Sequence, residues 1–303
     1  MHNMGILDLV GNTALVELPK TSRALNGIKL FAKAEFLNPS GSVKDRAVKS
    51  MLLDGIKRGN LREGKTIIDA TSGNSGIAYA MFGAALGFPV VLYLPANASR
   101  ERKRMISSFG AKIIETDPLE SSDGAYFAAC KVVEQDPERW FFADQYNNEE
   151  NWRAHYNTTA IEIWEQTKGE ITHFVSGLGT SGTFTGISKK LRELSPTIKS
   201  YAMQADSPFH GIEGTKHMAS VTHTGFYDER LPDGFIELST EDAYEQTRRL
   251  AREEGLFVGI SSGANVAAAL KLAERLPSGS TIVTMLCDSG SRYISDDFWT
   301  AGI

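Results

Sequence analysis

The sequence has 303 residues, of which 42% are hydrophobic, so it can form one large domain or two ordinary domains with buried cores. Its formal net charge is -5 and it contains no basic cluster, which argues against nucleic acid as a partner. Because it has neither a signal-peptide pattern nor roughly 18 consecutive apolar residues, we expect a cytoplasmic protein with no membrane partner.

Strand patterns and helix patterns alternate in the first half of the chain. Apolar side chains recur at helical spacing at Val43, Ala47, Met51 and Ile56, which predicts a helix over 42–59. Short apolar runs bounded by turn residues predict strands on either side of such helices. The expected strands are 29–36, 65–70, 89–95, 112–117 and 140–146, and the further expected helices are 75–87, 99–110 and 123–137.

The second half of the chain repeats this alternation. Its expected strands are 171–177, 198–206, 256–260 and 281–287, and its expected helices are 186–195, 240–255 and 263–277. Parallel strands need helical crossovers, so the pattern predicts mainly parallel sheets covered on both faces. One sheet of that many strands would be unusually large. We therefore expect two α/β domains, with a hinge near Asn147–Asn151 and a crossing of the chain near residues 36–40.

Glycine, serine and threonine are concentrated at three junctions between a strand and the next helix, residues 70–76, 176–186 and 259–265. In parallel sheets, ligands bind where the carboxyl ends of strands lead into helix N-termini. A single loop of this kind is often only a tight turn with capping hydroxyls. Three in one chain favour a binding site. The two cysteines, Cys130 and Cys287, lie far apart in the sequence, and we expect no metal site.

The second loop allows two interpretations. Residues 177–182 fit the pattern GxGxxG, and Asp206 ends the next expected strand about where a ribose-binding acid would lie, which favours a dinucleotide. The same loop also carries five hydroxyl side chains. A phosphate monoester has nearly two charges and benefits from N–H and hydroxyl donors at a helix start, so this loop suits a monoester better.

Lys44 lies near the start of the expected helix 42–59. Unpaired N–H groups give a helix N-terminus partial positive charge, so a cation is disfavoured there. That position, together with partial burial, would lower the lysine pKa and make its amine available as a nucleophile and base. An exposed surface lysine is the alternative. A reactive lysine combined with a cup for a phosphate monoester suggests pyridoxal phosphate as the cofactor.

The sequence resembles the fold-type II pyridoxal-phosphate enzymes and, within them, the cysteine synthase and cystathionine β-synthase family. The resemblance covers nearly the whole chain, in motifs that follow the family's order, at residues 9–18, 34–46, 71–80, 144–159, 176–186 and 259–272. It implies two three-layer α/β domains with a tryptophan synthase β-like fold and the cofactor in the interdomain cleft. The implied domains are a smaller one of residues 37–147 and a larger one of residues 1–36 plus 148–303.

The resemblance assigns roles to residues at matching positions. Lys44 matches the Schiff-base lysine, and Asn74 matches the asparagine that hydrogen-bonds the cofactor's ring oxygen. Ser261 matches the hydroxyl that faces the pyridine nitrogen, although the adjacent Ser262 is an alternative. The residues that match the phosphate cup are Gly179, Thr180, Ser181, Gly182 and Thr183. The residues that match those holding the substrate's α-carboxylate are Thr71, Ser72, Asn74, Ser75 and Gln145.

The expected pyridine partner indicates the type of reaction. A neutral serine hydroxyl gives a weaker electron sink than an aspartate would, which favours loss of a β-substituent over transamination. The resemblance implies that Lys44 takes the α-proton, leaving a bound aminoacrylate to which a sulfur nucleophile adds, so the expected product is cysteine. Condensation of serine with homocysteine, as in cystathionine β-synthase, is one alternative. A binding protein without catalytic activity is the other.

The donor substrate is expected to be O-acetylserine or O-phosphoserine. Some relatives with a cation in the segment that corresponds to residues 207–218 use O-phosphoserine, so Lys216 is a candidate to bind a substrate phosphate. We expect His210 and His217 to be structural or surface residues. Residues 287–295 are more similar to the B-type cysteine synthases than to the A-type. Asp69 and Ala70 stand where the family commonly has Glu and Pro, with little expected effect on cofactor binding.

The resemblance also implies protein partners. The family is typically homodimeric, and serine acetyltransferase or a sulfur-carrier protein are further candidates. In A-type relatives the active site accepts a C-terminal isoleucine peptide of the acetyltransferase, and this chain itself ends at Ile303. A frayed terminus is nevertheless the default. We expect Phe298 and Trp299 to anchor the C-terminal segment against the body of the protein or a dimer partner.

Overall fold

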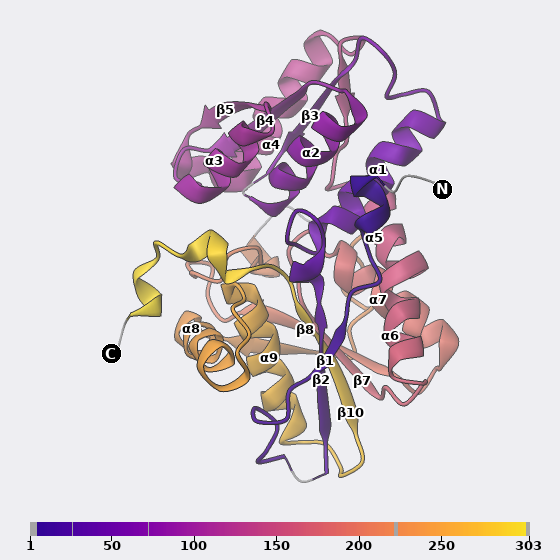
Figure 1. Cartoon of the computed structure of the whole chain (residues 1–303), viewed down its shortest axis with the longest axis vertical. Helices are drawn as coiled ribbons and strands as arrows, with labels where there is room; N and C mark the ends of the chain where they lie inside the picture. The colour runs from indigo at the N-terminus through magenta and orange to yellow at the C-terminus, as the bar shows by residue number, and fades with distance from the viewer. Residues whose placement is uncertain (1–4, 26, 72, 221–223, 301–303) are drawn as a thin grey trace. The chain divides into compact units, whose positions relative to one another are not determined.

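The computed structural model describes residues 5–25, 27–71, 73–220 and 224–300. The chain divides into two compact units, one of Met1–Val10 with Lys44–Asn151 and the other of Gly11–Val43 with Trp152–Ile303. Each unit has its own sheet with helices around it (Figure 1). The prediction of two α/β domains with mainly parallel sheets is confirmed.

The first unit is built on a four-stranded sheet in the order β5-β4-β3-β6, in which every pair is parallel. Its strands are β3 (Thr66–Ala70), β4 (Val90–Pro95), β5 (Lys112–Thr116) and β6 (Trp140–Phe142). Its helices are α1 (Lys44–Lys57), α2 (Asn74–Leu86), α3 (Arg100–Ser108) and α4 (Ser121–Gln135), with short 3₁₀ turns at Ile6–Leu9 and Pro118–Glu120. Helix α5 (Glu150–Ala154) leads the chain into the second unit.

Apolar side chains of the first unit are buried on both faces of its sheet. In β3, Ile67 packs with α1, α2 and α3, while its neighbour Ile68 packs with α4 on the opposite face. Helix α2 is apolar on nearly all sides, and its residues from Ser75 to Gly83 are all buried. Because α1 and α2 share one core, the start of α1 at Lys44 and the start of α2 at Asn74 are positioned by the same packing.

The second unit is built on a six-stranded sheet in the order β1-β2-β10-β7-β8-β9. Only the β1–β2 pair is antiparallel. The strands are β1 (Leu15–Glu17), β2 (Lys29–Ala34), β7 (His173–Gly177), β8 (Lys199–Ala205), β9 (Gly234–Leu238) and β10 (Thr281–Leu286). The helices are α6 (Ala160–Gln166), α7 (Gly182–Leu194), α8 (Thr240–Arg249) and α9 (Ile260–Ala273), with π-helices at His155–Thr159 and Leu250–Glu254 and 3₁₀ turns at Glu35–Leu37, Met218–Ser220, Gly290–Tyr293 and Asp297–Trp299.

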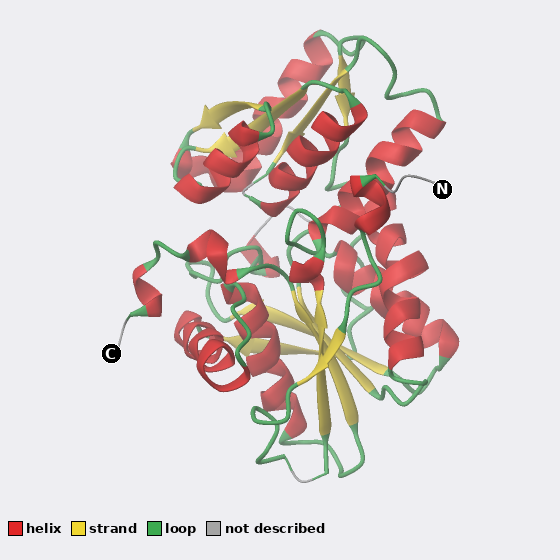
Figure 2. Ribbon diagram, in the orientation of Figure 1, coloured by secondary structure: helices red, strands yellow, loops and turns green. Residues whose placement is uncertain are grey.

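Helices cover both faces of this second sheet, α8 and α9 on one side and α6 and α7 on the other (Figure 2). Neighbouring strand residues alternate between the two cores: Phe174 packs with α7, whereas Val175 packs with α9. Helix α8 illustrates the local signals. Its N-cap hydroxyl of Ser239 accepts a hydrogen bond from the Asp242 N–H (3.1 Å), and two arginines lie in its last turn.

Three details of the second unit differ from the sequence predictions. Residues 256–260 do not form a strand, because only Val258 pairs, in a single bridge with Ser289. Strand β9 was not predicted, since it is an edge strand with buried residues only at Ile236 and Leu238. Strand β1 is three residues long, too short for a detectable apolar pattern.

Candidate active site

The loop that follows β3 presents a set of polar groups at the start of α2. Strand β3 ends at Ala70 and α2 begins at Asn74, so this is the carboxyl end of a parallel strand leading into a helix N-terminus. The Thr71 hydroxyl accepts a hydrogen bond from the Gly73 N–H (3.0 Å). The Ser75 hydroxyl donates to the side-chain oxygen of Gln145 (2.7 Å). Ser72, also predicted for this loop, lies outside the described residues.

Gln145 is held from several directions. Its side-chain amide donates to the Ala70 carbonyl oxygen (2.6 Å), and its own carbonyl accepts a hydrogen bond from Asn151 (2.7 Å). An amide nitrogen has two hydrogens, so one donor of Gln145 remains for another acceptor. The structure thus places Thr71, Ser75 and Gln145, three of the residues predicted to bind a carboxylate, near the end of β3. It also shows that Gln145 and Ser75 support the loop itself.

A buried carboxyl group lies behind this loop. Asp69, with no exposed surface, accepts hydrogen bonds from the Tyr79 hydroxyl (2.5 Å), the Ala70 N–H (2.8 Å) and the Gln145 N–H (3.3 Å). Burial raises the pKa of Asp69 to about 7, and the nearby Asp144 adds to the increase, whereas the hydrogen bonds oppose it. Burial and the Asp69 charge likewise raise the pKa of Tyr79. Sequence reasoning noted Asp69 only as a departure from the family pattern.

The Asp69→Asn variant is expected to remove part of the protein's pH dependence of stability. The carboxyl pKa is raised in the folded state, so the contribution of Asp69 to stability is fully present below pH 4 and is lost as pH rises towards 7. Asparagine stays neutral, so the variant should gain free energy of unfolding relative to wild type at roughly 1.4 kcal/mol per pH unit in this range. Urea unfolding of both proteins between pH 4 and 8 measures the difference. A difference that does not change with pH would contradict a raised pKa of Asp69 in the folded state.

Lys44 is the first residue of α1 and is half-buried. The sequence placed it near the start of this helix, and the structure places it at the start itself. The two following residues, Asp45 and Arg46, are buried, and the apolar face that begins at Ala47 packs on α2. The helix start is therefore fixed by the core of the first unit, which gives Lys44 a defined position.

The loop between β7 and α7, in the second unit, carries the residues that the sequence predicts to form a phosphate cup. Gly179 has no room for a side chain, because a Cβ there would overlap the carbonyl oxygen of Gly214. Ser181 is buried in the left-handed conformation (φ 63°), and its hydroxyl pairs with that of Thr224 (3.0 Å). The Lys216 N–H donates to the Leu178 carbonyl (2.7 Å), so the segment around residue 216 lies against this loop.

The composition of the cup fits a phosphate monoester. Its floor is the N-terminus of the 13-residue helix α7, where N–H groups are available to an anion. The loop and helix start also contain the hydroxyl residues Thr180, Ser181 and Thr183, and the absence of a side chain at Gly179 lets the loop pack closely on the Gly214 carbonyl. All five cup residues predicted from the sequence lie in this single turn and helix start.

The start of α9 holds the two serines between which the sequence could not decide. The Ser262 hydroxyl, fully buried, accepts a hydrogen bond from the Cys287 N–H (2.8 Å). Among the residues that the structure describes, the Ser261 hydroxyl makes no hydrogen bond, although its residue is only 7% exposed. The residue exposure of the two differs in the same direction, because Ser262 has no exposed surface.

Asn265 connects the cup loop with α9, and sequence reasoning did not identify it. Its side-chain oxygen accepts from the Gly177 N–H (2.7 Å), and its amide donates to the Met285 carbonyl (3.0 Å). It thereby ties the ends of β7 and β10 to the helix that carries Ser261. In the sequence, the signal for this role was an asparagine within a mostly apolar helix. An amide that is buried there needs specific hydrogen-bond partners.

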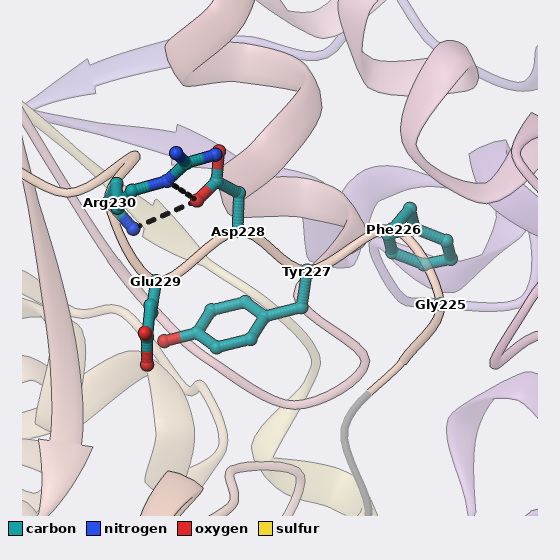
Figure 3. Close-up of a pocket in the computed structure, with 6 residues that line it drawn as sticks. All are labelled: Gly225, Phe226, Tyr227, Asp228, Glu229 and Arg230. Atoms are coloured by element: carbon teal, nitrogen blue, oxygen red, sulfur yellow. Dashed lines mark hydrogen bonds and ion pairs between the residues drawn. The ribbon is translucent and has the colours of Figure 1, made fainter.

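A separate pocket of about 530 Å³ is lined by one segment, Gly225–Arg230 (Figure 3). Asp228 and Arg230 form an ion pair with each other (2.9 Å) and are exposed at the surface. Within the described ranges, no group of three or more histidine, cysteine or acidic residues is arranged to hold a metal ion. No described helix is both long and apolar enough to cross a membrane.

Comparison with known proteins identifies the relatives of the chain. Residues 6–288 match the family described as pyridoxal-phosphate dependent enzyme. Cysteine synthase from Aquifex aeolicus is 50% identical over 295 residues, which cover 96% of this chain and 90% of the relative. Cysteine synthase B from Salmonella typhimurium is 40% identical over 286 residues, covering 94% and 93%. The crystal structure of cysteine synthase (OASS) from Entamoeba histolytica has a TM-score of 0.93 and 36% identity and covers 100% of this chain and 92% of that one.

Proposed function

Because this chain belongs to the pyridoxal-phosphate dependent enzymes and, within them, to the cysteine synthases, we propose that its donor is an O-activated L-serine and that the residues predicted from the sequence carry the reaction. The chain forms cysteine by β-replacement, with pyridoxal phosphate as its cofactor. The observation that carries the residue assignment is the cup at the start of α7, which is shaped by Gly179 and Ser181 and suits a phosphate monoester.

The second unit supplies the groups that hold the cofactor's phosphate and its pyridine nitrogen. When bound, pyridoxal phosphate supplies the electron sink that makes the α-proton of an amino acid acidic. The cup residues 179–183 bind its phosphate through N–H and hydroxyl donors. The Ser261 hydroxyl would donate a hydrogen bond to the pyridine nitrogen; Ser261 keeps some exposed surface, whereas Ser262 has none. A neutral partner of this kind favours β-replacement over transamination.

The first unit supplies the base and the group that binds the substrate carboxylate. Lys44 would hold the cofactor through its side-chain nitrogen, and the same nitrogen, as a free amine, would accept the α-proton of the substrate. Asn74 hydrogen-bonds the cofactor's ring oxygen. Thr71, Ser72, Asn74, Ser75 and Gln145 bind the α-carboxylate, which the N-terminus of α2 also stabilises.

Lys216 favours O-phosphoserine as the donor. Its backbone N–H donates to the carbonyl of Leu178, directly before the cup, so the segment that carries this lysine lies against the loop, which supports the proposal. Burial, together with the neighbouring His217, lowers the pKa of His210, so that histidine is a poor source of positive charge near neutral pH. We assign to Lys216 the binding of the donor's phosphate. O-acetylserine, which lacks this charge, is the weaker donor in this proposal.

The Lys216→Gln variant tests this assignment. With sulfide as the sulfur source, the KM for O-phosphoserine should rise about tenfold or more, because a charge-assisted hydrogen bond is lost. The KM for O-acetylserine should change by less than about twofold, since the acetyl group carries no charge. Steady-state assays of cysteine formation with O-phosphoserine, O-acetylserine and serine measure both effects.

Three comparisons make this assay decisive. Lys20→Gln changes an exposed lysine of the same unit and should leave every KM unchanged. Equal effects of Lys216→Gln on both activated serines would contradict a role for Lys216 in binding the leaving group. Product formation only when homocysteine replaces sulfide would contradict cysteine formation from an activated serine and favour the cystathionine reaction.

The expected cytoplasmic homodimer and its partners, serine acetyltransferase or a sulfur-carrier protein, stay proposals that rest on the family resemblance. The terminal Ile303 lies outside the described residues. Phe298 and Trp299 do pack within the second unit, where Phe298 stacks on Tyr244 and the Trp299 ring is tilted against Phe257 (ring centroids 4.7 Å apart in both pairs).

A further inference from the structure

A π-helix lies between α5 and α6, at His155–Thr159. A π-helix contains one extra residue per turn and is rare; where it occurs it is frequently part of a functional site. Its first and last residues, His155 and Thr159, are both buried, with His155 only 1% exposed. A buried imidazole needs hydrogen-bond partners at both ring nitrogens, and this one has them.

The imidazole of His155 joins the π-helix to the phosphate cup. Its Nδ1 lies 2.9 Å from the Thr159 hydroxyl, and its Nε2 lies 3.2 Å from the hydroxyl of the cup residue Thr183. The backbones are close as well. At Gly186, in α7, a Cβ would overlap the Trp152 carbonyl oxygen and would lie 2.8 Å from the Cβ of His155. The start of α7 is therefore seated directly against the π-helix.

The direction of these hydrogen bonds decides what Thr183 offers to a ligand. A hydroxyl has one hydrogen and two lone pairs. If Nε2–H donates to the Thr183 oxygen, the Thr183 hydrogen is left to donate into the cup. If Nε2 accepts instead, the Thr183 hydrogen is bonded to the imidazole, and only a lone pair of the Thr183 oxygen faces an anion in the cup. With the first arrangement Nδ1 accepts from the Thr159 hydroxyl, so both ring nitrogens are still satisfied.

We propose that His155 is a positioning residue for the cofactor's phosphate: its Nε2–H donates to the Thr183 oxygen and thereby directs the Thr183 hydrogen towards the phosphate. This inference rests on the proposed function, in which residues 179–183 bind that group. His155 does not touch the phosphate in this account. It acts through Thr183, and in the proposed tautomer the Thr159 hydroxyl donates to Nδ1, which leaves the ring hydrogen on Nε2.

A purely structural role for His155 makes a different prediction. If the imidazole only fills space beneath α7, its replacement weakens the binding of any cofactor form to a similar extent. If it orients Thr183, the loss is confined to ligands that carry a phosphate. Pyridoxal 5′-phosphate and pyridoxal, which lacks the phosphate, are the matched pair of ligands that separates the two cases.

Binding of both ligands to the cofactor-free protein, followed by absorbance titration, tests the proposal. His155→Asn keeps an amide near the position of Nδ1 and loses the group at Nε2, so the dissociation constant for pyridoxal phosphate should rise about 10- to 100-fold. The constant for pyridoxal should stay within about twofold. His155→Gln places an amide N–H near the position of Nε2 and should recover most of the loss.

Two further variants provide the controls. Thr158→Val removes a neighbouring hydroxyl that bonds the Ala154 carbonyl (2.6 Å), and it should leave both dissociation constants unchanged. Thr183→Val should reproduce the loss caused by His155→Asn, and the double variant should be no weaker than either single variant, because both remove the same interaction. Thr183→Val with its ligand pair also carries the test if His155→Asn does not fold.

The outcomes distinguish a failure of the positioning role of His155 from a failure of the proposed phosphate cup. Equal weakening of pyridoxal phosphate and pyridoxal by His155→Asn, or additive losses in the double variant, would overturn the positioning role. Wild-type protein that binds pyridoxal as tightly as pyridoxal phosphate would instead refute the cup itself. A selective, non-additive loss that His155→Gln recovers supports both.

Discussion

Replacement of Lys44 by alanine is expected to lower the rate of cysteine formation by roughly 10³-fold or more, since both a nucleophile and a proton-transfer group are lost. Lys44 is the first residue of α1 and is half-buried, and the helix that carries it is packed on α2. The fold should therefore survive the substitution. The variant should still bind pyridoxal phosphate through the cup, without a covalent link, and its visible absorbance should differ from that of wild type.

Lys49→Ala is the matched control for this variant. Lys49 lies in the same helix and is also half-buried, so its removal changes the same net charge and helix without touching the proposed base. It should retain nearly all wild-type activity. Comparable activity of Lys44→Ala and wild type, at equal cofactor content, would contradict the assignment of Lys44 as the base.

Replacement of Arg292 by methionine is expected to reduce the free energy of unfolding by about 3–5 kcal/mol, the usual result of breaking a buried ion pair. Arg292 is 1% exposed and lies 3.8 Å from the fully buried carboxylate of Asp288. Its guanidinium also donates to the Ser40 carbonyl. Methionine fills much of the space but would leave Asp288 without this counter-ion.

This cluster also fixes the segment that leads into α1. Ser42 pairs with Asp288 in a β-bridge, and the Val43 N–H donates to the Cys287 carbonyl (2.8 Å). Gly41 has φ +85°, a conformation that favours glycine, and a Cβ there would lie 3.2 Å from the Arg292 guanidinium. Because Lys44 follows directly, Arg292→Met should also weaken covalent attachment of the cofactor. From the sequence alone, residues 287–295 indicated only a similarity to the B-type cysteine synthases.

Urea unfolding of the Arg292 variants measures this effect. Arg292→Lys retains the charge but not the planar geometry and should lose less than Arg292→Met. Arg230→Met removes an exposed arginine of the same unit that pairs only with Asp228 two residues away, and should cost less than about 1 kcal/mol. A loss for Arg292→Met no larger than that for Arg230→Met would contradict the structural role of the buried pair.

Local sequence patterns were sufficient for most of the fold. The alternation of apolar strands with amphipathic helices predicted two mainly parallel sheets, and the glycine-rich loops marked the ends of β3 and β7 correctly. Residues 256–260 were misassigned because their apolar character comes from packing beside the start of α9 rather than from sheet pairing. The edge strand β9 was not predicted because alternate residues of this strand are exposed.

Features that depend on distant contacts were not predictable from one sequence. His155 and Thr183 are 28 residues apart, and Asn265 bonds a glycine 88 residues before it. The hydrogen bond between Ser262 and Cys287 likewise joins residues 25 positions apart. The roles of the predicted site residues stay predictions, although the structure groups those of each unit at a helix start.

Identification of the lysine that carries the cofactor tests the central claim most directly. Purified protein, loaded with pyridoxal phosphate, is reduced with borohydride to make the link permanent, then digested and analysed by peptide mass spectrometry. The account predicts a pyridoxyl-phosphate adduct on the peptide that contains Lys44 and on no other peptide at comparable yield. An adduct on a different lysine, or loaded protein that yields no adduct at all, would contradict it.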